Sequence, residues 1–272
     1  MTGSQARKDA VATLFSTTSS RHDSVGGLFA YFGSRIVEWS GLHAGDRVLD
    51  VAAGTGQSLV PAAARVGEAG HVTGTDLAPG MVELLRRAIR EHALDNTDAL
   101  VADAEQLPFD DGTFDAVLCG FGLFFFPDPG RALAEFRRVL RAGGVVAIST
   151  FTRAGSASMD RTWRLIGEHI AVPPPAPDET RFHEPDQLVS ALRAARFSNI
   201  EIEMSVFEIV LPDAETWLDW LRSMEFGEYV DQLGADAVER LKGSAAADLG
   251  VSAGSEEIRF TMDALLTRAK RP

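Results

Sequence analysis

The chain has 272 residues, 45% of them hydrophobic, and a formal charge of −13 at pH 7. This length allows one sizeable α/β core with an appended cap. Nucleic acids and anionic membranes require a basic face, so we expect neither as a partner, and small neutral or cationic molecules stay open. The single cysteine, Cys119, excludes an intramolecular disulfide. No apolar run reaches the ~18 residues of a membrane span and the N-terminus lacks a signal-peptide pattern, so we expect a cytoplasmic protein.

Helix-like apolar spacing comes first in the chain, over residues 9–21 and 27–40. From residue 46 short apolar runs alternate with amphipathic stretches. This alternation is typical of a parallel sheet whose strands are joined by right-handed helical crossovers. It predicts five strands separated by turns and helices, at 47–52, 71–77, 98–104, 114–122 and 145–151.

The pattern changes after residue 152. Helical spacing returns at 159–171 and 184–197, on either side of a stiff proline-rich loop. Residues 200–210 and 257–269 alternate like strands, and helical spacing fills about 213–249 between them. We therefore expect a late antiparallel strand, and a helical insertion that either caps the ligand edge of the sheet or adds to the core.

These elements predict a Rossmann-like, doubly wound, mostly parallel α/β sheet. We expect one domain over residues 1–272. Its parts are a helical cap over 1–45, a cofactor-binding core over 46–152, and a remainder over 153–272 that completes the sheet and contains the capping insertion.

A turn of small residues follows the first predicted strand in "VLDVAAGTGQS". Gly54 and Gly56 let the backbone approach a ligand, and the next helix presents its N-terminal N–H groups there. Asp76 ends the second strand, twenty residues after Gly56, where an acidic residue commonly binds ribose hydroxyls. Leu59 stands where a dinucleotide site has its third glycine, which counts against NAD or FAD.

Four ordered segments, DVAAGTG, GTDLAPGM, ADAEQLPFDDGTFDAV and FPDPGRALAEFRRVLRAGG, extend this pattern. Together they resemble the class I S-adenosylmethionine-dependent methyltransferases over about residues 10–150. The stretch before the glycine loop also looks like the ubiquinone/menaquinone C-methyltransferase branch (methyltransferase type 11) and its relatives that modify small natural products. The resemblance implies S-adenosylmethionine as the cofactor.

The same resemblance implies the cofactor contacts, although Ala52 replaces the first glycine of the broad class pattern. The methionine part would lie on the glycine loop, the ribose and adenine at the second and third strands, and the sulfonium at the fourth. The implied residues are Asp50, Ala52, Ala53, Gly54, Thr55 and Gly56 for methionine, Asp76, Leu77 and Met81 for the ribose and its surroundings, Asp103 and Ala104 for adenine, and Gly120 and Phe121 for the sulfonium.

Many small-molecule relatives carry histidines where this chain has Phe124–Phe126, so that general base is missing here. Aromatic faces near a sulfonium could contribute a cation–π attraction of about 0.5–2 kcal/mol. We predict His22 as the catalytic base, and Tyr31, Phe125 and His183 as substrate contacts. No spacing of His, Cys and acidic residues resembles a metal site.

The sequence thus predicts methyl transfer to a small, apolar or aromatic metabolite of secondary metabolism or quinone-like biosynthesis. The phenylalanine run and the tryptophans of the insertion, Trp217 and Trp220, motivate the apolar acceptor. Carbon is slightly favoured over oxygen as the accepting atom. Two alternatives stay open, a non-methylating reaction such as cyclisation with the cofactor retained, and a non-catalytic cofactor-binding protein. A homodimer also stays open.

Overall fold

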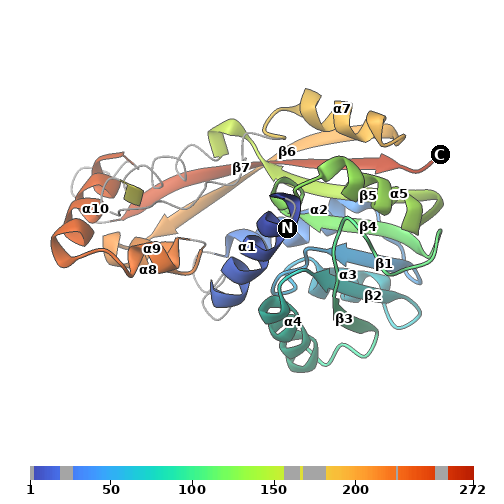
Figure 1. The fold of residues 1–272 in the computed structure, drawn as a ribbon, viewed down its shortest axis with the longest axis horizontal. Coiled ribbons are helices and arrows are strands. Elements are labelled where there is room, and N and C mark those ends of the chain that lie inside the picture. The colour runs from blue at the N-terminus through green and yellow to red at the C-terminus, as the bar shows by residue number, and fades with distance from the viewer. Residues whose placement is uncertain (1–2, 19–26, 156–165, 168–181, 225, 249–256) are drawn as a thin grey trace.

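A seven-stranded sheet forms the centre of the computed structural model, which describes residues 3–18, 27–155, 166–167, 182–224, 226–248 and 257–272. The strands lie in the order β3-β2-β1-β4-β5-β7-β6 (Figure 1). Their bounds are β1 (Arg47–Val51), β2 (His71–Asp76), β3 (Thr97–Val101), β4 (Phe114–Gly120), β5 (Leu140–Phe151), β6 (Ser198–Leu211) and β7 (Ile258–Lys270).

Strand direction confirms the predicted fold class. The first five strands pair parallel to one another, whereas β7 runs antiparallel to both β5 and β6. The chain builds outward from β1 to β3 and then returns to place β4 beside β1. A doubly wound sheet binds its ligand outside the carboxyl ends of the strands at such a reversal, so the end of β1 and β4 is where a site is expected.

Helices cover both faces of the sheet. One core cluster joins α2 (Leu28–Ser40), α3 (Leu59–Val66) and α4 (Pro79–Glu91) to β1 and β2, through residues such as Ile36, Ala62 and Leu85. A second cluster includes α5 (Pro129–Val139) and α7 (Pro185–Ala194), which pack against each other and against β5 and β6. The first helix, α1 (Gly3–Thr18), packs mainly on α4.

Three helices follow β6, namely α8 (Ala214–Arg222), α9 (Gly227–Val230) and α10 (Ala235–Asp248). They gather beside the end of β6 and the start of β7, at the left of the molecule and away from the C-terminus (Figure 1). Trp217 and Trp220 are buried in the core, and the Trp220 ring meets Phe260 edge-on at 5.3 Å. These tryptophans therefore serve packing. Of the described helices, none is long and apolar enough to cross a membrane.

The start of α3 is fixed in place by a close approach of α2. A Cβ atom added at Gly33, in the middle of α2, would lie 2.2 Å from the carbonyl oxygen of Gln57 and 3.0 Å from the amide nitrogen of Ser58. Only glycine leaves room for this backbone contact. The turn between β1 and α3 thus rests directly on α2.

We expect Gly33→Ala to lower the free energy of unfolding by about 1–3 kcal/mol, because the added methyl overpacks a rigid backbone contact. Gly243→Ala is the matched control, since Gly243 also lies in a helix but has nothing within 4 Å of an added Cβ. There the better helix propensity of alanine should stabilise by up to about 1 kcal/mol. Chemical denaturation of both variants measures the difference, and equal responses would contradict the overpacking.

Candidate functional site

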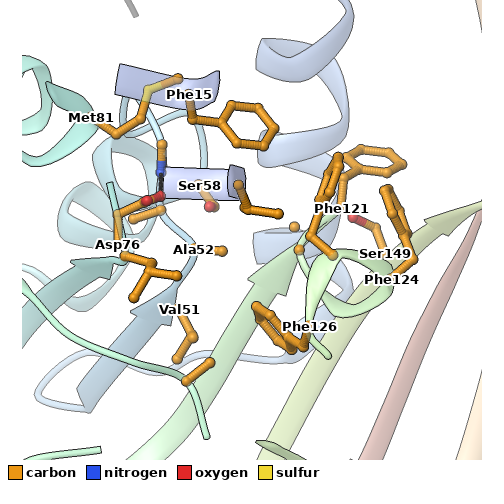
Figure 2. A pocket seen from close by; sticks show the side chains of 18 of the residues that line it. Phe15, Val51, Ala52, Ser58, Asp76, Met81, Phe121, Phe124, Phe126 and Ser149 are labelled. Carbon is orange, nitrogen blue, oxygen red and sulfur yellow. Dashed lines mark hydrogen bonds between the residues drawn. The ribbon is translucent and has the colours of Figure 1, made fainter. Parts of the chain in front are cut away.

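A cavity lies along the carboxyl ends of β1 to β5, where the strand order reverses between β1 and β4 (Figure 2). Its wall includes the turn after β1, the ends of β2 and β3, and the segment Gly120–Pro127 after β4. Lys8 and Phe15 of α1 and Met224, just after α8, also line it. Segments far apart in the sequence therefore close over one end of the sheet.

The turn after β1 exposes its backbone at the cavity floor. Ala52, Gly54 and Gly56 all have positive φ, at 55°, 53° and 93°. A Cβ at Gly54 would meet nothing within 4 Å, so the backbone there faces open space. A Cβ at Gly56 would lie 2.8 Å from the Leu85 side chain. Gly54 thus leaves the backbone open to a ligand, and Gly56 makes room for α4 to pack.

Asp76 holds this turn to the next strand. One oxygen of its carboxylate accepts a hydrogen bond from the Gly54 amide at 3.0 Å, and the other accepts one from the Ala78 amide at 2.9 Å. Burial raises the pKa of Asp76, although these backbone bonds oppose the shift. The carboxylate lines the cavity (Figure 2) and has further acceptor capacity toward it.

Ala52 takes a backbone conformation that favours glycine, and a glycine opposite makes room for it. A Cβ at Gly122 would lie 2.6 Å from the Cβ of Ala52 and 3.0 Å from the sulfur of Cys119. Residue 122 must therefore stay small because residue 52 carries a methyl group. Gly122, on the other side of the cavity floor, thus makes room for the alanine that stands in place of the glycine of the class pattern.

Asp50 lies behind the wall, fully buried, and does not line the cavity. One of its oxygens accepts a hydrogen bond from the Ser58 hydroxyl at 2.7 Å, and the other has no hydrogen-bond partner among the described residues. Burial raises the pKa of Asp50 to about 7. The hydrogen bond from Ser58 lowers this pKa, whereas the nearby negative charge of Asp76 raises it further. Ser58 itself lines the cavity and stands between Asp50 and the cavity.

The end of β3 carries a charge cluster that α1 completes. The Lys8 ammonium lies 2.7 Å from a carboxylate oxygen of Asp103 and 2.5 Å from one of Glu105. Burial alone would lower the pKa of Lys8, but its hydrogen bonds with the two acids outweigh this and raise it. Glu105 also accepts the Asp128 amide at 2.7 Å. The only lysine among the described lining residues is thus committed to two acids.

Aromatic rings form the opposite wall, at the ends of β4 and β5. Phe121 stacks on Phe151 with ring centroids 4.2 Å apart, and Phe29 of α2 meets Phe121 edge-on at 5.7 Å. Phe15 of α1 meets Phe125 edge-on at 5.1 Å. Figure 2 shows Phe121 and Phe124 beside Ser149, across the cavity from Asp76 and Met81.

His183 lies at the β5 end of the cavity, and is 6% exposed. The Thr150 hydroxyl donates to the Phe182 carbonyl oxygen at 2.9 Å, which ties this segment to β5. Phe182 has a positive φ of 69°, an uncommon state for a bulky residue. On the other side, Glu184 and Gln187 form a capping box at the start of α7. The backbone around His183 is therefore held from both directions.

The structure brings together most of the residues that the sequence singles out. Asp50, Gly56 and Tyr31 lie outside the lining, and the Tyr31 ring stacks on Phe207 at 4.8 Å. His22 falls outside the described residues. The sequence-derived residues that line the cavity are Ala52, Ala53, Gly54, Thr55, Asp76, Leu77, Met81, Asp103, Ala104, Gly120, Phe121, Phe125 and His183.

Sequence reasoning missed several lining residues. Ser58 and Glu105 lie within the segments VLDVAAGTGQS and ADAEQLPFDDGTFDAV and could have been found from them. Ser149 could have been found as an end-of-strand residue on β5. Lys8, Phe15 and Phe29 come from N-terminal helices whose position over the sheet no local pattern fixes, and Met224 comes from the late insertion.

Comparison with known proteins supplies the family. A methyltransferase domain family matches residues 49–148. The aklanonic acid methyltransferase DauC of Streptomyces sp. (strain C5) is 40% identical over 55% of this chain and 69% of its own length. The ubiquinone/menaquinone biosynthesis C-methyltransferase UbiE of Idiomarina loihiensis is 34% identical over 60% of this chain and 68% of its own. The chain belongs to the S-adenosylmethionine-dependent methyltransferases of the UbiE type.

Among solved structures, the [4+2]-cyclase SpnF superposes on this chain with a TM-score of 0.54. The alignment covers 89% of this chain and 80% of the cyclase, at 24% identity. A likeness at this identity shows a shared fold, and it carries no information about the reaction. The predicted cofactor, S-adenosylmethionine, follows from the family.

The cavity fits that cofactor. It offers an open backbone cradle at Gly54 and acidic side chains at the ends of β2 and β3. A buried hydroxyl, Ser149 Oγ, has no hydrogen-bond partner among the described residues. Acidic groups suit ribose hydroxyls and the adenine amino group, and the aromatic wall suits a sulfonium.

We expect Asp50→Asn to change how stability depends on pH. The carboxyl has a pKa of about 7 in the folded chain and an ordinary pKa near 4 when unfolded. Between these values the folded state binds more protons, so wild-type stability falls as pH rises from about 4 to about 7. Asparagine cannot ionise, so the stability of the variant relative to wild type should rise by up to about 4 kcal/mol across this window.

Urea denaturation at a series of pH values measures this difference. Asp110→Asn is the control, because Asp110 is an exposed acid outside the cavity lining. Parallel pH profiles for Asp50→Asn and wild type would contradict the raised pKa.

Proposed function

We propose that the chain transfers a methyl group from S-adenosylmethionine to a small, uncharged, apolar or aromatic acceptor. The observation that carries this proposal is the division of the cavity along the sheet edge. Acidic and small residues lie at the ends of β1, β2 and β3, and aromatic residues lie at the ends of β4 and β5. A polar cofactor suits the first half, and an apolar acceptor suits the second.

In this proposal Asp76 accepts the ribose hydroxyls and the backbone from Ala52 to Gly56 follows the methionine part. Leu77 and Met81 lie beside the ribose and adenine. Asp103 accepts the adenine amino group next to the Ala104 amide. Lys8 pairs with both Asp103 and Glu105 and offsets one of their two negative charges, so the protein would meet the adenine with one negative charge left over.

The methyl donor supplies an activated sulfonium carbon, so the residues of the chain mainly position the acceptor against it. Phe121 stands at the boundary between the two halves of the cavity, with Gly120 beside it. Its stacking on Phe151 fixes its ring orientation. A cation near such a ring gains about 0.5–2 kcal/mol.

The charges of the wall support an uncharged acceptor. Among the described lining residues, the acids lie on the cofactor side, and Lys8 is paired with two of them. The β4 and β5 half offers rings, Met224, His183 and the Ser149 hydroxyl. An apolar or aromatic body with one or two polar groups suits this half.

Carbon is the favoured accepting atom. The name of the UbiE relative describes a C-methyltransferase of ubiquinone and menaquinone biosynthesis, and that of DauC an aklanonic acid methyltransferase. A small molecule of secondary metabolism or quinone-like biosynthesis is consistent with both names. His22 lies outside the described residues, so its role stays a prediction from the sequence alone. Tyr31 would act on the acceptor only from outside the described lining.

We expect Asp76→Ala to weaken binding of S-adenosylhomocysteine about 10- to 100-fold, because a charged acceptor of hydrogen bonds contributes about 1.5–3 kcal/mol. Wild type should also discriminate against the 2′,3′-dideoxy analogue, and the variant should not. Titration calorimetry measures all four affinities. Asp110→Ala is the control. A variant that keeps the discrimination would contradict the ribose contact, even if its affinity falls through loss of the Gly54 anchor.

The reaction itself is tested by mass spectrometry. We expect incubation with S-adenosylmethionine and a set of hydroxylated aromatic compounds to give S-adenosylhomocysteine and a product heavier by one methylene unit. Conversion without a change of mass and without S-adenosylhomocysteine would favour cyclisation. Cofactor binding with no conversion of any compound in the set would favour a non-catalytic protein.

A further inference from the structure

His183 differs from the other ionisable side chains that line the cavity. Those among the described residues are Lys8, Asp76, Asp103, Glu105 and His183. The first four lie at the ends of β2 and β3, on the proposed cofactor side. His183 lies at the end of β5, on the aromatic side, where an acceptor would bind. Its imidazole is thus the one described ionisable group in the acceptor half.

The backbone around His183 holds it in an unusual conformation. Phe182 has a positive φ, which costs about 1–2 kcal/mol for a residue with a side chain. The Thr150 bond and the capping box of α7 hold the segment on either side. Strain that is kept in place by surrounding contacts is common at functional positions. Here it places an imidazole among aromatic rings at the β5 end.

We propose that His183 binds a hydroxyl group of the acceptor and takes its proton during methyl transfer. This inference rests on the proposed function. The Phe124–Phe126 segment supplies no base, and in this proposal the base comes from His183, beside the end of β5. Imidazole suits the role because its ordinary pKa of about 6.5 lies close to neutral pH.

One proton leaves for each methyl group transferred. The acceptor's oxygen, or a ring carbon activated by it, forms the new bond to carbon as the carbon–sulfur bond breaks and its electron pair stays on sulfur. The hydroxyl proton goes to His183 and from there to water. Where a ring carbon is methylated, the proton on that carbon then moves to the oxygen and restores the aromatic hydroxyl, so one proton leaves in either case. The acceptor class is therefore a phenol or hydroquinone rather than a compound without an acidic hydroxyl.

Binding without any cofactor tests the contact. We would titrate the protein with 1-naphthol and with 1-methoxynaphthalene, which has no hydroxyl proton to donate. Wild type should bind 1-naphthol about tenfold more tightly, the value of one hydrogen bond near 1.4 kcal/mol. His183→Phe should lose this preference and keep its affinity for S-adenosylhomocysteine, which shows that the variant is folded. A preference that survives in His183→Phe would overturn the proposal.

Turnover tests the proton transfer, with 1,4-dihydroxynaphthalene as the acceptor. His183→Gln keeps a hydrogen-bond acceptor of similar size but no base. It should keep the preference for 1-naphthol and lose about 10²- to 10⁴-fold in kcat. His22→Gln is the comparison, since His22 is the base that the sequence suggests. A His183→Gln variant within threefold of wild type would overturn the role of base.

Failure of the proposed function has a different signature. If wild type binds S-adenosylmethionine but methylates no hydroxylated aromatic compound, the proposed reaction fails for this class of acceptor. The binding comparison then decides on His183 alone. Loss of the 1-naphthol preference in His183→Phe would support the contact, and its persistence would exclude it.

Discussion

The site depends on one carboxylate that connects two turns of the chain at the edge of the sheet. Asp76 uses both oxygens to hold amide groups of the turn after β1 and of the start of α4. Because β1 and β2 are parallel neighbours, their carboxyl ends meet, and a single acid can connect the two turns. Together with the hydrogen bonds from the Ala53 amide to the Thr75 carbonyl oxygen and from the Gly56 amide to the Ala53 carbonyl oxygen, the bond to Asp76 positions the backbone at Gly54, which has positive φ and faces open space.

Three acids stand in a row along this edge, and each is stabilised differently. Asp50 is buried with one Ser58 bond, Asp76 has backbone donors, and Asp103 has the Lys8 ammonium. Unpaired burial disfavours ionisation, which explains why the pKa of Asp50 rises to about 7. The three acidic side chains become less buried in the order β1, β2, β3. The acids that would meet a ligand are those that already have partners, so binding adds to a network instead of creating one.

The sheet could be predicted from the sequence because local patterns decide it. Buried apolar runs end in small or acidic residues at each strand of the core, and parallel geometry then brings those ends together. The N-terminal and late helices carry no such rule. Lys8 reaches Asp103 across 95 residues of sequence, and Met224 reaches the same cavity from an insertion whose tryptophans pack elsewhere. Periodicity shows that these segments are helical, but their position depends on tertiary contacts alone.

The effect of Ala52 could not be predicted from local patterns either, because it also depends on a tertiary contact. Read alone, an alanine at a position that favours glycine looks like a weakened site, because positive φ costs about 1–2 kcal/mol for a residue with a Cβ. The structure shows that Gly122, 70 residues away, leaves room for the Ala52 methyl group. That glycine lies directly after Phe121, which itself has a positive φ of 54°. The methyl of Ala52, the gap at Gly122 and the turned backbone of Phe121 therefore form one unit. Because Phe121 also stacks on Phe151, the packing of Ala52 against Gly122 in the turn after β1 is linked to the aromatic rings at the ends of β4 and β5.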